Sequence, residues 1–186
     1  MDREVEIDIE DIRKSNLLDI PESCRGCVYW ECPSDFEKGK SDPQRKAESE
    51  IKKREWFEKT LDEFGTCGKI VYHEGVPVAY AQYAPSARLP NIKEYESKDV
   101  GKLEEGTVFL SCLYVADEAL RDKGVGETLL QNVIEDLRRR GFKAIETFAC
   151  RSQANNPSGP MAFYVKNGFH IKDKTNPEFP LMRLLL

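Results

Sequence analysis

The chain has 186 residues, a formal net charge of −5 and six cysteines. This length suits one domain with a substantial core. The negative charge argues against general affinity for nucleic acid or for an anionic membrane surface. No apolar run approaches the roughly 18 residues of a membrane-spanning helix, and the N-terminus lacks a signal-peptide pattern. We therefore expect a cytoplasmic protein whose cysteines are thiols, metal ligands or core residues, not disulfides.

The first third of the chain predicts a strand, an irregular cysteine-containing loop and a long helix. Apolar and acidic residues alternate over 5–9, as in a half-exposed strand. Cysteine, proline and glycine interrupt any pattern over 21–42. Asp42 can cap a helix and Pro43 suits its first position, which predicts a helix over 43–64. Its basic run, 52–54, is interpreted as a solvated patch.

Two strand-like segments follow, 69–72 and 76–83, and the turn 73–75 between them contains glycine. Their spacing predicts a β-hairpin. The connection 85–106 is rich in proline and charge, and long connections in compact domains are usually functional or mobile.

The central feature of the chain is a strand, a glycine-containing loop and a helix. The segment 107–115 is apolar or β-branched on both faces, as in a buried central strand. Arg121, Lys123, Gly124 and Gly126 follow it. The next helix carries one apolar stripe, formed by Val125, Leu129, Leu130, Val133, Ile134 and Leu137. Because the free amides of a helix start attract anions, this loop predicts a phosphate-binding site; the alternative is that the glycines only turn the chain.

Two common phosphate-binding patterns fit this loop poorly. The P-loop spacing of glycine, lysine and serine or threonine is absent. A dinucleotide-binding pattern would use Gly124, Gly126 and an acid about 20 residues on, where Glu146 stands. However, Leu129 occupies the position of its third glycine, and the strand does not lead into a tight turn.

Two motifs together carry a resemblance to a known family. Arg121, Gly124 and Gly126 match the pattern Arg/Gln-x-x-Gly-x-Gly/Ala after a central strand, and 163–169 matches Phe/Leu-Tyr-x-x-x-Gly-Phe. In this combination the chain resembles the GNAT superfamily of acetyl-CoA-dependent N-acetyltransferases. The resemblance covers roughly 68–186.

The resemblance implies an α/β (α+β) fold with a mixed, mostly antiparallel sheet and helices on both faces. Its centre would be the strand–pyrophosphate loop–helix unit. The further strands are expected at 144–149, 169–171 and 179–186. We expect a single domain over 1–186, in which 1–66 is a divergent N-terminal part.

The resemblance also implies how acetyl-CoA is held. Backbone groups of the central strand would bind pantetheine, and the loop would bind pyrophosphate. The family often has a cofactor-contacting asparagine at the position that Pro157 occupies here, and Asn155 and Asn156 would take over that contact. The implied residues are Leu113, Tyr114, Val115, Arg121, Asp122, Lys123, Gly124, Val125, Gly126, Asn155 and Asn156.

Acyl transfer to an amine needs a neutral amine, a polarised carbonyl and a stabilised thiolate. Tyr164 stands where the superfamily keeps its general acid, and the alternative is a buried tyrosine with one hydrogen bond. Glu146 is either a base with a raised pKa at the cleft or a solvent-facing strand residue. Cys112 could suggest a covalent route, although small buried cysteines are common in core strands.

The cysteines Cys24, Cys27 and Cys32 lie close together in the N-terminal loop, but a zinc or iron–sulfur site typically needs a fourth ligand. We expect no metal. The neighbouring Tyr29, Trp30 and Glu31 suit a pocket for an amine, or alternatively core packing with a surface acid.

We therefore interpret the chain as an N-acetyltransferase that acts on an amine-bearing small molecule or peptide by direct transfer in a ternary complex. The alternatives are a non-catalytic acyl-CoA-binding module on the same fold and a metal or redox sensor built on the N-terminal cysteines. The sequence does not distinguish the possible acceptors or oligomeric states.

Overall fold

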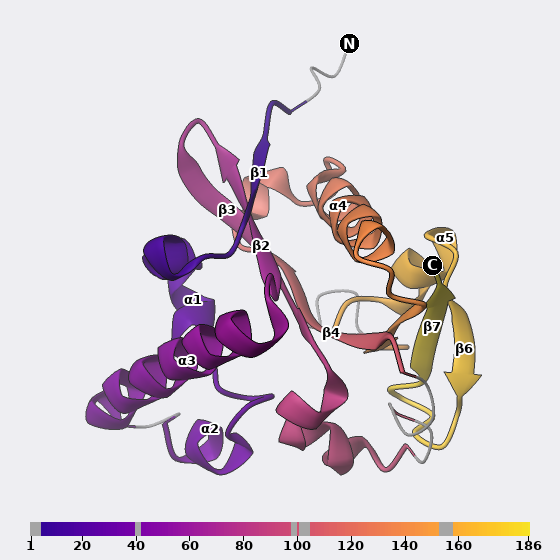
Figure 1. The fold of residues 1–186 in the computed structure, drawn as a ribbon, viewed down its shortest axis with the longest axis horizontal. Coiled ribbons are helices and arrows are strands. Elements are labelled where there is room, and N and C mark those ends of the chain that lie inside the picture. The colour runs from indigo at the N-terminus through magenta and orange to yellow at the C-terminus, as the bar shows by residue number, and fades with distance from the viewer. Residues whose placement is uncertain (1–4, 40–41, 98–99, 101–104, 153–157) are drawn as a thin grey trace.

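A computed structural model describes residues 5–39, 42–97, 100, 105–152 and 158–186 (Figure 1). Its strands are β1 (Asp8–Asp11), β2 (Gly68–His73), β3 (Val76–Ala84), β4 (Thr107–Val115), β5 (Ala144–Phe148), β6 (His170–Asp173) and β7 (Leu181–Leu185). Its α-helices are α1 (Glu22–Arg25), α2 (Pro33–Gly39), α3 (Pro43–Phe64), α4 (Val125–Arg139) and α5 (Met161–Lys166). Short 3-10 helices are η1 (Lys14–Asp19), η2 (Ser86–Arg88), η3 (Pro90–Tyr95) and η4 (Glu118–Leu120). None of the helices in these ranges is both long and apolar enough to cross a membrane.

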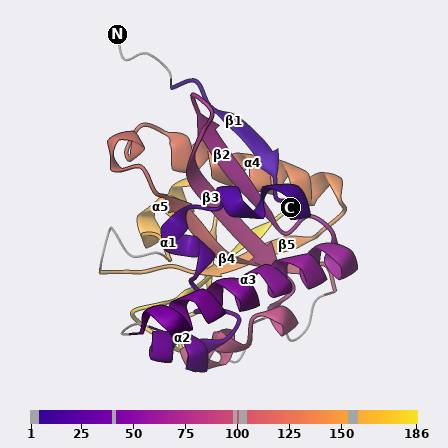
Figure 2. The ribbon, with the colours of Figure 1, turned by 90° about the vertical axis from the view of Figure 1, so that its left-hand side faces the viewer.

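The strands form one sheet in the order β1-β2-β3-β4-β5-β7-β6. Among these seven described strands, β4 and β5 are parallel, and the other neighbouring pairs are antiparallel. The predicted mixed, mostly antiparallel sheet is confirmed. Helix α3 crosses one face of the sheet and α4 lies behind it (Figure 2).

Alternation of side chains along the strands explains why both faces of the sheet are covered. Val71 and Ala79 pack in the core that contains the apolar stripe of α4. Their neighbours Ile70 and Tyr80 point to the opposite face and pack with Phe57 of α3. All six predicted stripe residues of α4 are buried.

Helix α3 has the predicted bounds and the predicted cap, because the Asp42 carboxylate accepts a hydrogen bond of 3.0 Å from the Gln44 amide. Its buried stripe contains Ser49, Lys53, Phe57 and Thr60. Lys53 is only 2% exposed, so the interpretation of 52–54 as a solvated patch is wrong at that residue. Its ammonium group instead binds a buried carboxylate described below.

The hairpin between β2 and β3 is also confirmed, and both turn residues, Glu74 (φ 51°) and Gly75 (φ 76°), have positive φ. Two-residue hairpins of this kind follow the twist of the strands. Within the long connection after β3, η2 and η3 pack Leu89, Ile92 and Tyr95 against the sheet.

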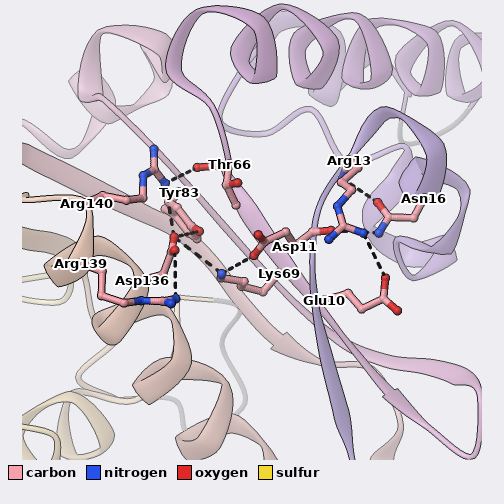
Figure 3. Close-up of polar contacts among 10 residues, drawn as sticks. All are labelled: Glu10, Asp11, Arg13, Asn16, Thr66, Lys69, Tyr83, Asp136, Arg139 and Arg140. Carbon is pink, nitrogen blue, oxygen red and sulfur yellow. Dashed lines mark hydrogen bonds and ion pairs between the residues drawn. The ribbon is translucent and has the colours of Figure 1, made fainter.

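A buried polar network ties the N-terminal strands to the end of α4 (Figure 3). The ammonium group of Lys69 hydrogen-bonds to Asp11 and lies 3.7 Å from Asp136. The Tyr83 hydroxyl donates to Asp136 at 3.2 Å, and Arg140 reaches the same carboxylate at 3.4 Å. Arg140 also donates to two carbonyl oxygens at and just beyond the end of α3. The network therefore couples α3, α4 and three strands.

Buried cysteine thiols and tyrosine phenols predict how the stability of the fold changes at alkaline pH. Burial raises the pKa of the Cys24 thiol to about 11 and that of Cys67 to about 12, and it raises the phenol pKa values of Tyr80 and Tyr83. An unfolded thiol loses its proton near about pH 8.5 and an unfolded phenol near about pH 10. Because the folded chain holds these protons longer, its stability is highest below these values and falls as pH rises. We expect the melting temperature to drop steadily from pH 9 to pH 11. A constant melting temperature over that interval would contradict this.

Candidate active site

The two parallel strands separate after a short contact. Strand β4 pairs with β5 only from Thr107 to Phe109, opposite Ala144 to Glu146. The Thr147 hydroxyl then donates to the Leu110 carbonyl at 2.9 Å, at the point of separation. On its other side β4 remains paired with β3 as far as Val115. Within the described part of the chain, the second half of β4 therefore has no strand partner on the side of β5.

A β-bulge coincides with this separation. Gln82 pairs with Cys112 and Tyr83 pairs with Leu110, which leaves Ser111 as the extra residue on β4. The Ser111 hydroxyl donates to the Gln82 carbonyl at 3.1 Å. Bulges bend a strand and are common beside active sites. The bulge shifts the β3–β4 register by one residue and explains how β4 diverges from β5 while it stays paired with β3.

The separated strands open into a cleft of about 410 Å³. It lies between the end of β4, the loop before α4, and α5. Its lining consists of Leu113, Tyr114, Val115, Leu120, Arg121, Asp122, Gly124, Gly126, Glu127, Gly159, Pro160, Phe163, Tyr164 and Lys166.

The loop before α4 presents the start of that helix to the cleft. Gly124 is its N-cap and has φ 83°, a conformation that favours glycine. A methyl group added at Gly124 would meet no atom within 4 Å, so open space surrounds it. Arg121 is held beside it, with Nε donating to the Val115 carbonyl at 3.1 Å and the guanidinium 5.7 Å from the ring centroid of Tyr114. An anion in this cleft would meet helix amides and a positioned cation.

Most of the predicted coenzyme-binding residues meet at this cleft. Seven line it, namely Leu113, Tyr114, Val115, Arg121, Asp122, Gly124 and Gly126. Lys123 is exposed and does not appear in the lining, whereas Val125 is buried in the core with the α4 stripe. Asn155 and Asn156 lie outside the described residues.

Tyr164 reaches the cleft from α5 and is 2% exposed. A methyl group built at Gly159 would lie 3.3 Å from its hydroxyl oxygen, so that glycine leaves room for the phenol. Burial raises the pKa of Tyr164 above its usual range, and a hydrogen bond with the Thr147 side chain partly opposes this. The phenol is therefore a neutral hydrogen-bond donor at physiological pH.

The alternative that Glu146 is a solvent-facing strand residue is wrong. It is 1% exposed and does not face solvent. Its Oε1 accepts hydrogen bonds from Lys172 at 2.6 Å and from Arg183 at 2.8 Å. Two cationic side chains therefore bind the same oxygen of this buried carboxylate. The sequence could not reveal the pairing, because both cations come from strands β6 and β7 much further along the chain.

The predicted acceptor residues lie on the α3 face and are not part of the cleft lining. Trp30 stacks on Tyr95, with 5.4 Å between ring centroids, and the Tyr29 hydroxyl lies 2.9 Å from that of Tyr95. Glu31 is buried, so the alternative of a surface acid is wrong. Its Oε1 receives hydrogen bonds from Lys53 at 2.6 Å and from Gln82 at 2.5 Å.

The cysteines form no metal site within the described residues. Burial raises the thiol pKa values of Cys24, Cys32 and Cys112, so these thiols carry little thiolate at neutral pH. Low thiolate content makes a thiol a poor nucleophile. A covalent route through Cys112 is therefore disfavoured.

Replacing Cys24, Cys27 and Cys32 together by serine is expected to leave coenzyme A affinity unchanged. None of the three lines the cleft, and their segment packs beside α3 on the other face of the sheet. Calorimetric titration of folded variant and wild type measures this. A loss of affinity would show that the segment contributes to coenzyme A binding. Stoichiometric zinc or iron in protein purified without chelator would contradict the expectation that the cysteines bind no metal.

The cleft beside the separated part of β4, with a glycine-containing helix start in its lining, is the candidate active site. A family model described as "Acetyltransferase (GNAT) family" matches residues 27–169. The chain therefore belongs to the GNAT acetyltransferase family, and the match begins earlier than the motifs alone indicated. A search of curated proteins gives no match.

Solved structures share the fold at low sequence identity. The PaiA N-acetyltransferase from Thermoplasma acidophilum, in complex with coenzyme A, is 15% identical over 97% of this chain and 99% of that one, with a TM-score of 0.60. An N-acetyltransferase from Staphylococcus aureus Mu50 is 17% identical over 97% and 98%, with a TM-score of 0.57. A GNAT family acetyltransferase from Brucella melitensis, in complex with acetyl-CoA, is 14% identical over 98% and 89%, with a TM-score of 0.55.

Proposed function

We propose that the protein is an N-acetyltransferase that moves an acetyl group from acetyl-CoA to an amine within a ternary complex. The observation that carries this proposal is the cleft in which unpartnered β4 backbone, the α4 start and Tyr164 meet. Membership of the family supports it, as do relatives of the same fold whose structures contain coenzyme A or acetyl-CoA.

The residues of the cleft fit the cosubstrate in two places. Helix amides at Gly124 to Gly126 and the guanidinium of Arg121 offer hydrogen bonds and positive charge to the pyrophosphate. The Leu113 backbone and the Val115 amide face away from β3, so they offer the hydrogen bonds of an edge strand to the amide-containing pantetheine arm. The Tyr114 backbone faces β3, and the Val115 carbonyl already accepts from Arg121, which leaves Tyr114 to line the cleft with its side chain. The thioester then lies toward the point where β4 and β5 separate.

In the transfer, the amine nitrogen forms a bond to the acetyl carbon and the bond from that carbon to sulfur breaks. Tyr164 donates its hydroxyl hydrogen toward the departing sulfur and so stabilises the negative charge. The nitrogen loses its surplus proton to a base. Glu146 is poorly placed to accept it, because Lys172 and Arg183 already bind its Oε1 and it does not line the cleft; we assign it a structural role.

The acceptor is an amine-bearing small molecule or peptide. We place its entrance on the α3 face, opposite the coenzyme cleft, where Tyr29 and Cys112 are half-buried. The six unpaired cysteines fit a reducing compartment, and we propose the cytoplasm.

A screen with isotopically labelled acetyl-CoA and a panel of amines tests the proposed function. Polyamines, amino acids, peptides with free N-termini and lysine-containing peptides cover the acceptor classes. Mass spectrometry should detect one labelled acetyl group on the nitrogen of at least one acceptor, with stoichiometric release of coenzyme A. Tight binding of acetyl-CoA without consumption in any reaction would favour a non-catalytic binding module instead.

A further inference from the structure

A second cleft lies between η1, α1 and α3, and no residue of its lining belongs to the lining of the first. Its volume is about 260 Å³. Its lining consists of Leu17, Leu18, Ile20, Arg25, Ala47, Glu50, Ile51, Lys53, Arg54 and Phe57. Sites for drug-sized ligands typically measure about 300–1,000 Å³, so this cleft suits a smaller molecule.

The walls of the second cleft are aliphatic and open to solvent. Leu18 is 74% exposed and Ile51 is 49% exposed. Both belong to the small set of large apolar side chains that the described part of the chain leaves exposed. Leu17 and Phe57 are buried beneath them. A concave surface with exposed aliphatic edges gains free energy when an alkyl chain covers it.

Two arginines border this apolar surface without an acidic partner among the described residues. Arg25 is oriented by one hydrogen bond, from Nη1 to the Leu18 carbonyl at 2.7 Å. Its Nε is shielded from solvent and has no acceptor within the described ranges. Arg54 lines the same cleft from α3 and makes no ion pair with any described residue. Lys53 also lines the cleft, but its ammonium group already binds Glu31. Glu50 is the one carboxylate in this lining.

We propose that the second cleft binds a small aliphatic carboxylate. The alkyl chain lies along Leu18 and Ile51, and the carboxylate pairs with Arg25 and Arg54. Nη1 of Arg25 is held by the Leu18 carbonyl, which fixes the guanidinium at the edge of the cleft. Nη2 of Arg25 makes no hydrogen bond with any described residue and is the group that pairs with the carboxylate, since Nε is shielded from solvent.

Calorimetric titration with octanoate, below the concentration at which it forms micelles, tests this site. Wild-type protein should bind one octanoate. R25Q and R54Q should each weaken binding by at least about tenfold, because each removes a charge-assisted hydrogen bond. The matched control is R45Q on the same helix, since Arg45 pairs with Asp42 and lies outside the cleft; it should bind as wild type does. Octanol, which lacks the charge, should bind at least about tenfold more weakly than octanoate.

A second variant covers the case in which loss of Arg25 disturbs folding. L18E changes an exposed side chain and places a negative charge beside the carboxylate, so it should abolish octanoate binding in a folded protein. Equal affinities of wild type and L18E, or of octanoate and octanol, would overturn the proposal. A wild-type dimer that L18E converts to a monomer would also overturn it, because a second copy of the chain would then occupy the groove.

Discussion

Replacing Gly124 by aspartate is expected to weaken coenzyme A binding by at least about a hundredfold and to leave the fold intact. The side chain fits, because a methyl group at this position meets no atom within 4 Å. Aspartate tolerates positive φ better than most residues do. Its charge, however, stands at the start of α4, where a phosphate would bind. Two like charges about 4 Å apart repel by about 4 kcal/mol at a protein surface.

The matched control for this variant is Gly124→Asn. Asparagine has nearly the same shape and the same tolerance of positive φ, but it carries no charge. We expect it to retain most of the affinity that aspartate removes, when both are titrated with coenzyme A by calorimetry. Circular dichroism confirms folding. Wild-type affinity in a folded Gly124→Asp protein would show that the pyrophosphate binds elsewhere.

Replacing Tyr164 by phenylalanine is expected to lower kcat by about 10²–10⁴-fold, the usual contribution of general acid catalysis. The ring that packs against Phe169 remains, so the affinity for acetyl-CoA should change little. Because burial raises the pKa of this phenol, it stays protonated as pH rises, and its ionisation should not lower the wild-type rate below about pH 10.

Tyr83→Phe is the control that separates catalysis from structure. Tyr83 is also fully buried, but its hydroxyl donates to Asp136, a residue of α4 in the buried polar network described above. Its loss should cost about 1 kcal/mol of stability and leave kcat per folded molecule near the wild-type value. If Tyr164→Phe behaves in the same way, its hydroxyl is structural, and backbone positioning carries the reaction.

Local patterns in the sequence predicted the elements that local physics determines. Asp42 and Pro43 predicted the start of α3, and the apolar stripe predicted the buried face of α4. The hairpin turn and the loop at Gly124 follow from residues that accept positive φ. These features depend on residues that lie close together in the sequence, which is why the sequence alone was sufficient to predict them.

The parts that sequence reasoning missed depend on contacts between distant segments. Lys53 appeared to belong to a solvated basic run, yet its ammonium group binds the buried Glu31 carboxylate, which also accepts from Gln82. Glu146 was expected to be either a base at the cleft or a solvent-facing strand residue, and nothing in the sequence indicated that β6 and β7 supply two cations to it. The bulge at Ser111 exists only in relation to the register of β3. No periodicity in one segment can reveal a partner in another.

The separation of β4 from β5 creates an edge strand inside the sheet, at its centre and not at its rim. Unpaired strand edges readily pair with other extended chains, and proteins usually protect them. Here the natural protection is the cosubstrate itself, if it binds along this edge. By mass action a ligand that binds only the folded chain also stabilises it. On the proposed function, the concentration of acyl-coenzyme A would therefore set the stability of the folded chain as well as supply its reaction.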